Sequence, residues 1–240
     1  MTTTSKQPRN AIESARRTIE LELRAVEQLQ HRIDESFTHA VELLSAVKGR
    51  VIVSGMGKSG HIGNKIAATL ASTGTPAQFV HPAEACHGDM GMITRSDAAL
   101  LMSNSGTTAE ITALLPLLKR LGLPIVAMTG NPDSTLARAA DAHLNISVDE
   151  EACPLDLAPT ASTTANLVMG DALAIAMLEQ SGFTAEDFAF THPGGALGRR
   201  LLTRVSDVLV TGSDIPKVSL TMSLADALME ISAKGLGMST

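Results

Sequence analysis

The chain has 240 residues, of which 44% are hydrophobic but only 2% aromatic, with no Trp and no Tyr. This length suits one large α/β domain and a smaller segment, with a core of aliphatic side chains and methionine. A net charge of −6 and the shortage of aromatic rings argue against nucleic-acid or membrane-surface binding. The two cysteines form no disulfide framework, residues 1–10 hold no signal-peptide core, and no apolar run approaches the ~18 residues of a membrane span. We therefore expect a cytoplasmic protein.

Residues 8–48 are expected to form one long helix, because apolar side chains recur there every seven residues. These are Ile12, Ile19, Val26, Ile33, Ala40 and Val47. A helix of this length before the first strand needs a cover for its apolar stripe, so we expect it to pack on its own domain and on a partner subunit. Packing on one domain alone is the alternative.

The first predicted strand, residues 50–54, leads through the glycine-rich turn Gly55–Gly60 into an alanine-rich helix. The turn is no P-loop, because Ile52 stands where that motif needs its first glycine. Its spacing fits a dinucleotide fingerprint, but the next strand, residues 77–80, is followed by His81 rather than by the acidic residue that binds a ribose. A dinucleotide site is therefore not expected.

Lys58 and Ser59 are the polar residues of this turn. A lysine here would hold a phosphate or stabilise negative charge that develops on oxygen during a reaction. A solvated lysine with no such role is the alternative.

The segment His81–Asp89 holds two histidines, a cysteine and two carboxylates. Its spacing matches no closed zinc cluster, so we expect zinc bound through His81 to be adventitious or inhibitory rather than required. We expect His81 and His87 to hydrogen-bond sugar hydroxyls. Turn residues without a ligand are the alternative.

The stretch Ser103–Glu110 has the strongest functional signal. It follows a buried strand, residues 98–102, and precedes a helix expected over residues 111–121. Free N–H groups at a helix start, combined with short hydroxyls, make a cradle for a phosphate, and Gly106 lets the backbone approach the anion. A helix cap explains one hydroxyl. The stretch has four, on Ser103, Ser105, Thr107 and Thr108.

Strands predicted over residues 124–129 and 143–148 complete an alternation with helices. The alternation predicts an α/β fold, a three-layer αβα sandwich with a five-stranded parallel sheet. Ligands of such sheets bind beyond the carboxyl ends of the strands. The polar candidates follow strand ends: Lys58, His81, Ser103, Ser105, Glu110, Asp149, Glu150 and Glu151.

The acidic loop at residues 149–151 precedes an apolar helical segment, residues 165–180, which we expect to be buried between subunits or behind the sheet. Further on, His192 stands between Thr and Pro ahead of a glycine pair. This is a rigid setting for a surface histidine, although a capping or packing role would also explain it.

Residues 205–240 differ in character from the rest. Residues 217–220 predict a strand and Ser223 predicts a helix cap. The pattern resembles the opening of a cystathionine-β-synthase (CBS) regulatory motif. We expect a linker and a truncated CBS region, loose or packed against the body.

Taken together, the motifs resemble the sugar isomerase (SIS) domain family and, within it, the arabinose-5-phosphate isomerases. The resemblance covers about residues 10–205 and rests on the stretches GMGKSGHIG, STGTPAQFVHPAEACHGDMGM, ACPLDLAPTASTTA and HPGGALGR. It implies an SIS domain over residues 49–204, a homotetramer, and interconversion of D-ribulose 5-phosphate and D-arabinose 5-phosphate for Kdo and lipopolysaccharide synthesis. The chain has Thr107-Thr108-Ala109 where the family has Glu-Ser-Ser, which keeps a hydroxyl in the loop.

The resemblance also implies roles for individual residues. It places the catalytic set at Lys58, Glu110, Glu151 and His192. It places substrate contacts at Gly74, Thr75, His81 and His87, to which the residue types add Ser59, Ser103, Asn104, Ser105 and Thr108 as further ligands, chiefly of the phosphate. We expect Glu151 to be the base, with Glu110 as second choice. We expect His192 to open the furanose ring and Lys58 to stabilise the enediolate, with no required cofactor.

Three alternatives stay open. One is a non-catalytic sugar-phosphate sensor on the same fold, which needs the hydroxyl loop but not Lys58, Glu151 and His192 together. Another is an isomerase of a different phosphosugar, such as a hexulose 6-phosphate. The third is a metal-dependent hydrolase, which chelation would inhibit, built on His81, Glu84, His87 and Asp89.

Overall fold

The computed structural model describes residues 10–240, apart from the side chains at positions 196 and 197. The chain divides into two compact units, the first ending at Thr191 and the second running from His192 to Thr240. The boundary expected between residues 204 and 205, and the assignment of its two sides to SIS and CBS domains, stay predictions.

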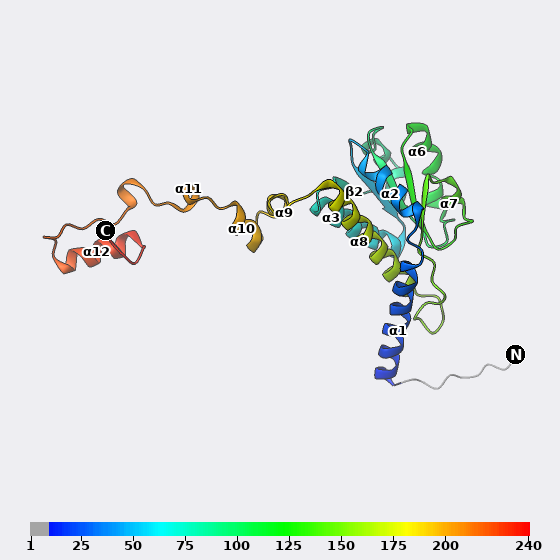
Figure 1. Ribbon diagram of the computed structural model, residues 1–240, viewed down its shortest axis with the longest axis horizontal. Coiled ribbons are helices and arrows are strands. Elements are labelled where there is room, and N and C mark those ends of the chain that lie inside the picture. The colour runs from blue at the N-terminus through cyan, green and yellow to red at the C-terminus, as the bar shows by residue number, and fades with distance from the viewer. Residues whose placement is uncertain (1–9) are drawn as a thin grey trace. The chain divides into compact units, whose positions relative to one another are not determined.

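A five-stranded sheet forms the centre of the first unit (Figure 1). All its strands are parallel, in the order β2-β1-β3-β4-β5. The strands are β1 (Val51–Gly55), β2 (Ala77–Phe79), β3 (Ala98–Met102), β4 (Ile125–Thr129) and β5 (Ala142–Asn145). Every residue of β1, β3 and β4 is buried, as expected for central parallel strands with helices on both faces.

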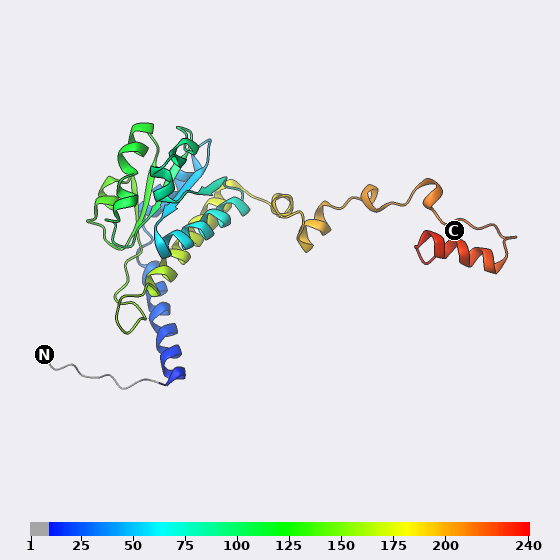
Figure 2. The same cartoon turned by 180° about the vertical axis from the view of Figure 1, so that it is seen from behind.

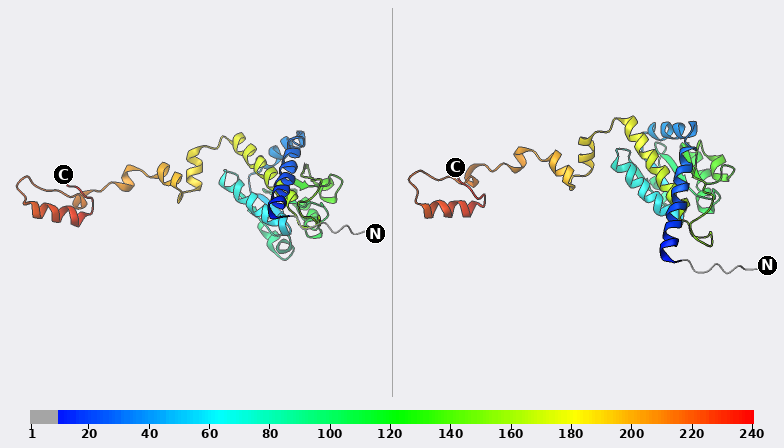
Figure 3. Two further views of the ribbon diagram at one scale, coloured as in Figure 1. Left: turned by 90° about the horizontal axis from the view of Figure 1, so that it is seen from below. Right: turned by 60° about the horizontal axis from the view of Figure 1, so that its bottom comes forward.

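Helices cover both faces of this sheet, so the predicted three-layer sandwich is confirmed. One face packs against α2 (Glu35–Ser45), α3 (Gly57–Ser72) and α8 (Ala161–Ser181), and α1 (Ala11–Gln30) lies along α8 (Figure 3). The other packs against α4 (Pro82–Cys86), α5 (Ala109–Thr112), α6 (Leu115–Leu121) and α7 (Thr135–Ala139), as the view from behind shows (Figure 2). A 3₁₀ turn, η1 (Asp89–Met92), and α9 (Ala185–Thr191) complete the unit.

The long helix predicted over residues 8–48 is two helices, α1 and α2, so the expectation of one helix was wrong. The chain turns between them at residues 31–34, where Asp34 accepts a hydrogen bond from the N–H of Ser36 at 2.9 Å and caps α2. The apolar spacing runs through Ile33 without a glycine or proline, so the periodicity hides this break. Residues 8 and 9 lie outside the described part of the chain.

The helix predicted over residues 111–121 is also divided, into α5 and α6. Pro116 takes the second position of α6 and has no N–H, so it cannot donate the hydrogen bond that would continue a helix from Thr112. The result is a short α5 of four residues directly after the hydroxyl loop.

By length and composition, α8 is apolar enough to cross a membrane. Half of its most apolar window is nevertheless buried inside the fold, and Met169, Leu173 and Met177 are each at most 2% exposed. This burial is typical of the core helix of a folded domain, and it agrees with the position behind the sheet predicted for residues 165–180.

The second unit contains four short elements: α10 (Ala196–Leu202), α11 (Val205–Val208), η2 (Gly212–Asp214) and α12 (Leu224–Lys234). The predicted cap is confirmed, since the hydroxyl of Ser223 accepts a hydrogen bond from the N–H of Asp226 at 3.1 Å. The strand predicted over residues 217–220 does not form. Two backbone hydrogen bonds join Pro216 and Val218 to Thr240, and this pairing is too short to make a strand.

Candidate functional site

The strand order changes direction between β1 and β3. From β1 the chain moves outward to β2, then returns past β1 to β3 and continues to β5. Open parallel sheets bind ligands at the carboxyl ends of the strands, at such a switch point. Gly55 at the end of β1 pairs with Met102 at the end of β3, so the turns that follow these strands begin side by side.

The turn after β1 is tight because glycine packs against glycine. A Cβ on Gly60 would lie 2.6 Å from the carbonyl oxygen of Gly55, which explains the glycine spacing without a dinucleotide. No side chain caps the start of α3, since Met56 at its N-cap makes no such hydrogen bond. The first N–H groups of α3 are thus available to an anion, beside an exposed Lys58 and a half-buried Ser59.

Hydroxyl groups hold together the turn after β3. The Oγ of Ser103 lies 2.8 Å from Oγ1 of Thr108 and accepts a hydrogen bond from the N–H of Gly106 at 3.0 Å. The Oγ of Ser105 accepts hydrogen bonds from the N–H and the hydroxyl of Thr107, at 3.3 and 3.2 Å. Ser103 is only 3% exposed and shapes the loop from inside, whereas Ser105 and Thr107 are exposed.

This hydroxyl loop, residues 103–108, is anchored to the turn after β4. The carbonyl of Gly106 accepts a hydrogen bond from Leu136 at 3.0 Å, and the carbonyl of the exposed Asn104 accepts one from Gly130 at 2.9 Å. Gly106 has a φ of 66°, and a Cβ there would meet the hydroxyl of Ser134 at 2.0 Å. Glycine is therefore required at position 106 both by the backbone conformation and by the contact.

The two candidate bases differ in how they are held. Glu110 lies half-buried in the first turn of α5 and makes no side-chain hydrogen bond or ion pair within residues 10–240. The Oε2 of Glu151 accepts three hydrogen bonds, from the N–H (2.7 Å) and hydroxyl (3.0 Å) of Thr160 and from the N–H of Ser162 (3.2 Å). Glu151 thus caps the N-terminus of α8, where a carboxylate is favoured. Its Oε1 has no hydrogen-bond partner in the described chain.

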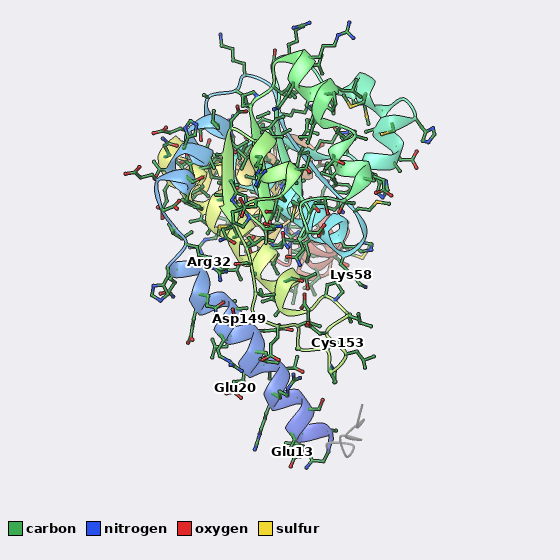
Figure 4. The ribbon with its side chains drawn as sticks, turned by 90° about the vertical axis from the view of Figure 1, so that its right-hand side faces the viewer. Glu13, Glu20, Arg32, Lys58, Asp149 and Cys153 are labelled. Atoms are coloured by element: carbon green, nitrogen blue, oxygen red, sulfur yellow. The ribbon has the colours of Figure 1, made fainter. Side chains whose placement is uncertain are left out.

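The start of α8 and the loop before it lie at the same end of the sheet as the start of α3 (Figures 1 and 2). In Figure 4, Lys58 lies next to this loop, which carries Cys153. The edge after the strands therefore gathers three stretches of the first unit: the start of α3 with Lys58 and Ser59, the hydroxyl loop with the following Glu110, and the loop that carries Glu151.

His81 follows β2 and takes the N-cap position of α4. Its Nδ1 is buried without a hydrogen-bond partner in the described residues, and its ring lies edge-on to Phe79, with 6.5 Å between the ring centroids. A cavity of about 330 Å³ opens beside it, with His61 and Asn64 also on its wall. Because a buried polar atom without a partner is costly, His81 is well placed to bond a polar ligand. His87 ends α4 and is exposed.

Three of the predicted residues are not brought to this edge within the first unit. Gly74 and Thr75 lie between α3 and β2, at the amino edge of the sheet. Because α3 has 16 residues, about 24 Å separate them from Lys58. Their predicted substrate contacts would need a second copy of the chain. His192 belongs to the second unit.

No three His, Cys, Asp or Glu side chains within residues 10–240 are placed to share a metal ion. The hydrolase alternative therefore lacks a described cluster at His81, Glu84, His87 and Asp89. Zinc contact through His81 stays a prediction.

Two titratable groups near this edge have shifted pKa values. Burial lowers the pKa of His143 on β5, against the opposing effects of a hydrogen bond with Thr129 and the charge of Asp34. The backbone of residues 155–158, Ala158 most strongly, lowers the pKa of the Cys153 thiol.

Comparison with known proteins identifies the family of this chain. The SIS domain model matches residues 43–176. Arabinose 5-phosphate isomerase KdsD of Pseudomonas aeruginosa is 66% identical over 227 residues, which cover 95% of this chain and 70% of that protein. The chain belongs to the arabinose 5-phosphate isomerase family of SIS domains.

KdsD of Escherichia coli K12 is 58% identical over 226 residues, which cover 94% of this chain and 69% of that protein. Among solved structures, the c3406 protein of E. coli CFT073, in complex with arabinose 5-phosphate, has a TM-score of 0.74 at 43% identity, with 80% of this chain and 100% of that chain covered. The resemblance drawn from the sequence motifs is therefore confirmed for the family, and the truncated CBS region stays a prediction.

Proposed function

We propose that this chain is an aldose–ketose isomerase that interconverts D-ribulose 5-phosphate and D-arabinose 5-phosphate and supplies Kdo for lipopolysaccharide synthesis. One observation carries the proposal. The switch point joins the uncapped start of α3, with Lys58, to the hydroxyl loop in a chain that is 66% identical to a named isomerase of this kind.

The phosphate of the sugar is held by the hydroxyl loop and the start of α3. Ser105 and Thr107 present exposed hydroxyls, and Ser59 lies in the first turn of the neighbouring helix. Free N–H groups and partial positive charge at a helix start favour an anion. Ser103 and Thr108 hold the loop in the shape that this binding requires.

The reaction moves one proton between adjacent carbons. Glu151 removes the proton from C2 of open-chain arabinose 5-phosphate, and the electron pair passes toward the C1 carbonyl to give a cis-enediolate. Return of that proton at C1, with transfer of the C2 hydroxyl proton to the C1 oxygen, gives ribulose 5-phosphate. The step balances without a redox cofactor.

Glu151 suits the role of base because one of its oxygens is fixed and the other has no hydrogen-bond partner within residues 10–240. The three donors to Oε2 define the plane of the carboxylate, and Oε1 is the atom that transfers the proton. Lys58 stabilises the enediolate oxygen as an exposed cation at the start of α3. His192 opens the furanose form, an assignment that rests on the HPGGALGR motif.

A homotetramer is part of the proposal. Ile12, Ile19 and Leu23 on α1 are 65%, 68% and 55% exposed, and an apolar stripe of this kind on a helix favours a partner helix. A second copy would also bring Gly74 and Thr75 within reach of a neighbouring site. A cytoplasmic location, as expected for a sugar-phosphate enzyme, completes the proposal.

Incubation with ribulose 5-phosphate in deuterated water tests the function. We expect NMR to show deuterium at C2 of the aldose product and to identify that product as the arabinose epimer. We expect Glu151→Gln to lower kcat by at least about 100-fold with little change in KM. Substrate binding without deuterium incorporation would favour the sensor. Loss of activity in Glu110→Gln but not in Glu151→Gln would exchange the roles of the two glutamates.

A further inference from the structure

Polar side chains of α1, and of the turn that follows it, contact the segment that contains Glu151. Gln28 donates a hydrogen bond to Oδ2 of Asp149 at 2.6 Å, close to where Figure 4 shows Asp149 against the helix. Arg32 donates to the backbone of the same segment, and Glu22 accepts from the first turn of α8 at 2.9 Å. The proposed mechanism gives these contacts no role.

Arg17 makes the contact that bears most directly on Glu151. Its Nη1 donates a hydrogen bond to the carbonyl oxygen of Ala152 at 2.7 Å. Its Nη2 lies 3.5 Å from a carboxylate oxygen of Glu150. One guanidinium therefore contacts both the residue immediately before Glu151 and the residue immediately after it.

The loop itself holds Glu151 from the other side. The N–H of Glu151 donates to Oδ1 of Asp156 at 2.8 Å, and the N–H of Ala152 donates to the hydroxyl of Thr160 at 2.8 Å. The backbone around Glu151 is thus fixed between its own loop and the guanidinium of Arg17.

We propose that Arg17 is a positioning residue that sets the reach of the Glu151 carboxylate, an inference that rests on the proposed role of Glu151 as the base. Arg17 acts through the backbone on both sides of Glu151 and does not touch the substrate. A base that shifts by about 1 Å can lose on the order of 100-fold in rate. The planar fork of Arg17 fixes two points at once, which a lysine cannot do.

Stability alone does not explain the arrangement. The side chains of Arg17 and Glu150 are 27% and 51% exposed, and ion pairs so open to solvent add little to folding. Removal of the guanidinium should therefore affect turnover much more than unfolding.

Steady-state kinetics of the full chain test this inference. We expect Arg17→Met to lower kcat about 10- to 100-fold. We expect KM to stay near the unmodified value, because the hydroxyl loop that holds the phosphate is untouched. The kcat of Arg17→Lys should lie between that of Arg17→Met and that of the unmodified chain, because lysine can keep one of the two contacts. Arg16→Met is the matched control, because Arg16 is an exposed neighbour that makes no hydrogen bond or ion pair within residues 10–240, and it should behave as the unmodified chain.

Coupling to Glu151 separates positioning from a general structural effect. If Arg17 acts through Glu151, Arg17→Met should not slow Glu151→Gln any further. Thermal melting of each variant checks folding, and Arg17→Lys carries the test if Arg17→Met does not fold. Equal kcat in Arg17→Met and Arg16→Met, or an additive loss in the double variant, would overturn the inference. An inactive unmodified chain would instead refute the proposed function, and an active Glu151→Gln would remove the base on which the inference depends.

Discussion

Gly106→Ala is the substitution whose effect the structure defines most closely. The backbone at Gly106 has a φ of 66°, which costs alanine about 1 kcal/mol. The new Cβ would also lie 2.0 Å from the hydroxyl and 2.4 Å from the Cβ of Ser134, so Ser134 must move. Ser134 caps α7 through a hydrogen bond from Ala137 at 3.3 Å, and loss of such a cap costs about 1 kcal/mol.

The two costs sum to about 2 kcal/mol, which corresponds to a fall in Tm of roughly 4–8 °C for a domain of this size. The substitution also displaces the hydroxyl loop, so we expect a higher KM for the sugar phosphate. Urea unfolding and substrate titration measure the two effects separately.

A control variant and a double variant test whether the collision with Ser134 causes the loss of stability. Gly91→Ala is the control, because a Cβ there would have nothing within 4 Å and the φ of Gly91 is not positive. The double variant Gly106→Ala/Ser134→Gly removes the collision but keeps the backbone strain. It should recover roughly half of the lost stability, since glycine replaces serine at an N-cap at little cost. Unchanged stability in Gly106→Ala, or no recovery in the double variant, would show that the collision with Ser134 does not determine the loss of stability.

Lys58→Met should lower kcat by about 100-fold with native folding, as steady-state kinetics would show; an unchanged kcat would exclude oxyanion stabilisation. Ile19→Glu should give a smaller assembly by light scattering, and an assembly of unchanged size would show that the apolar stripe on α1 is not an interface. Because burial lowers the pKa of His143, its stabilising effect should be complete above the unfolded value of 6.5 and decline as the pH falls below it; His143→Gln should flatten the dependence of Tm on pH there. Alkylation of Cys153 in a Cys86→Ser background should have a midpoint below pH 9.0, and a midpoint at or above it would contradict the backbone effect.

Four of the five strands could be predicted to within one residue at each end. Residues 98–102 form β3 as expected, because a short apolar run between turn residues has few other solutions. The last strand ends at Asn145 rather than residue 148, because the side-chain oxygen of Asn145 accepts a hydrogen bond from the N–H of Ser147 and turns the chain. A side-chain hydrogen bond that ends a strand in this way cannot be read from the spacing of hydrophobic residues.

The candidate site could be predicted in its residue types but not in its geometry. Strand ends place Lys58 and Ser103 at one edge by topology alone. The hydrogen bond from Arg17 to the carbonyl oxygen of Ala152, 135 positions later in the chain, depends on tertiary packing between distant segments. The cap that Glu151 makes on Thr160, 9 positions later, depends on the path of the loop between them. No periodicity encodes these contacts. The sequence held one signal for the three donors to Glu151, which is the cluster of hydroxyl residues between Thr160 and Thr164.

The late position of α8 in the chain has a consequence for biosynthesis. One side of the sheet buries Ala165, Met169, Leu173 and Met177, which a ribosome adds only after all five strands are complete. When β5 has just been synthesised, the five strands are therefore complete, but the apolar surface that α8 will cover is still exposed beside α2 and α3. Domains emerge at about 5–20 residues per second, so this surface is exposed for seconds. That interval is when a growing chain of this protein most needs the protection of a chaperone.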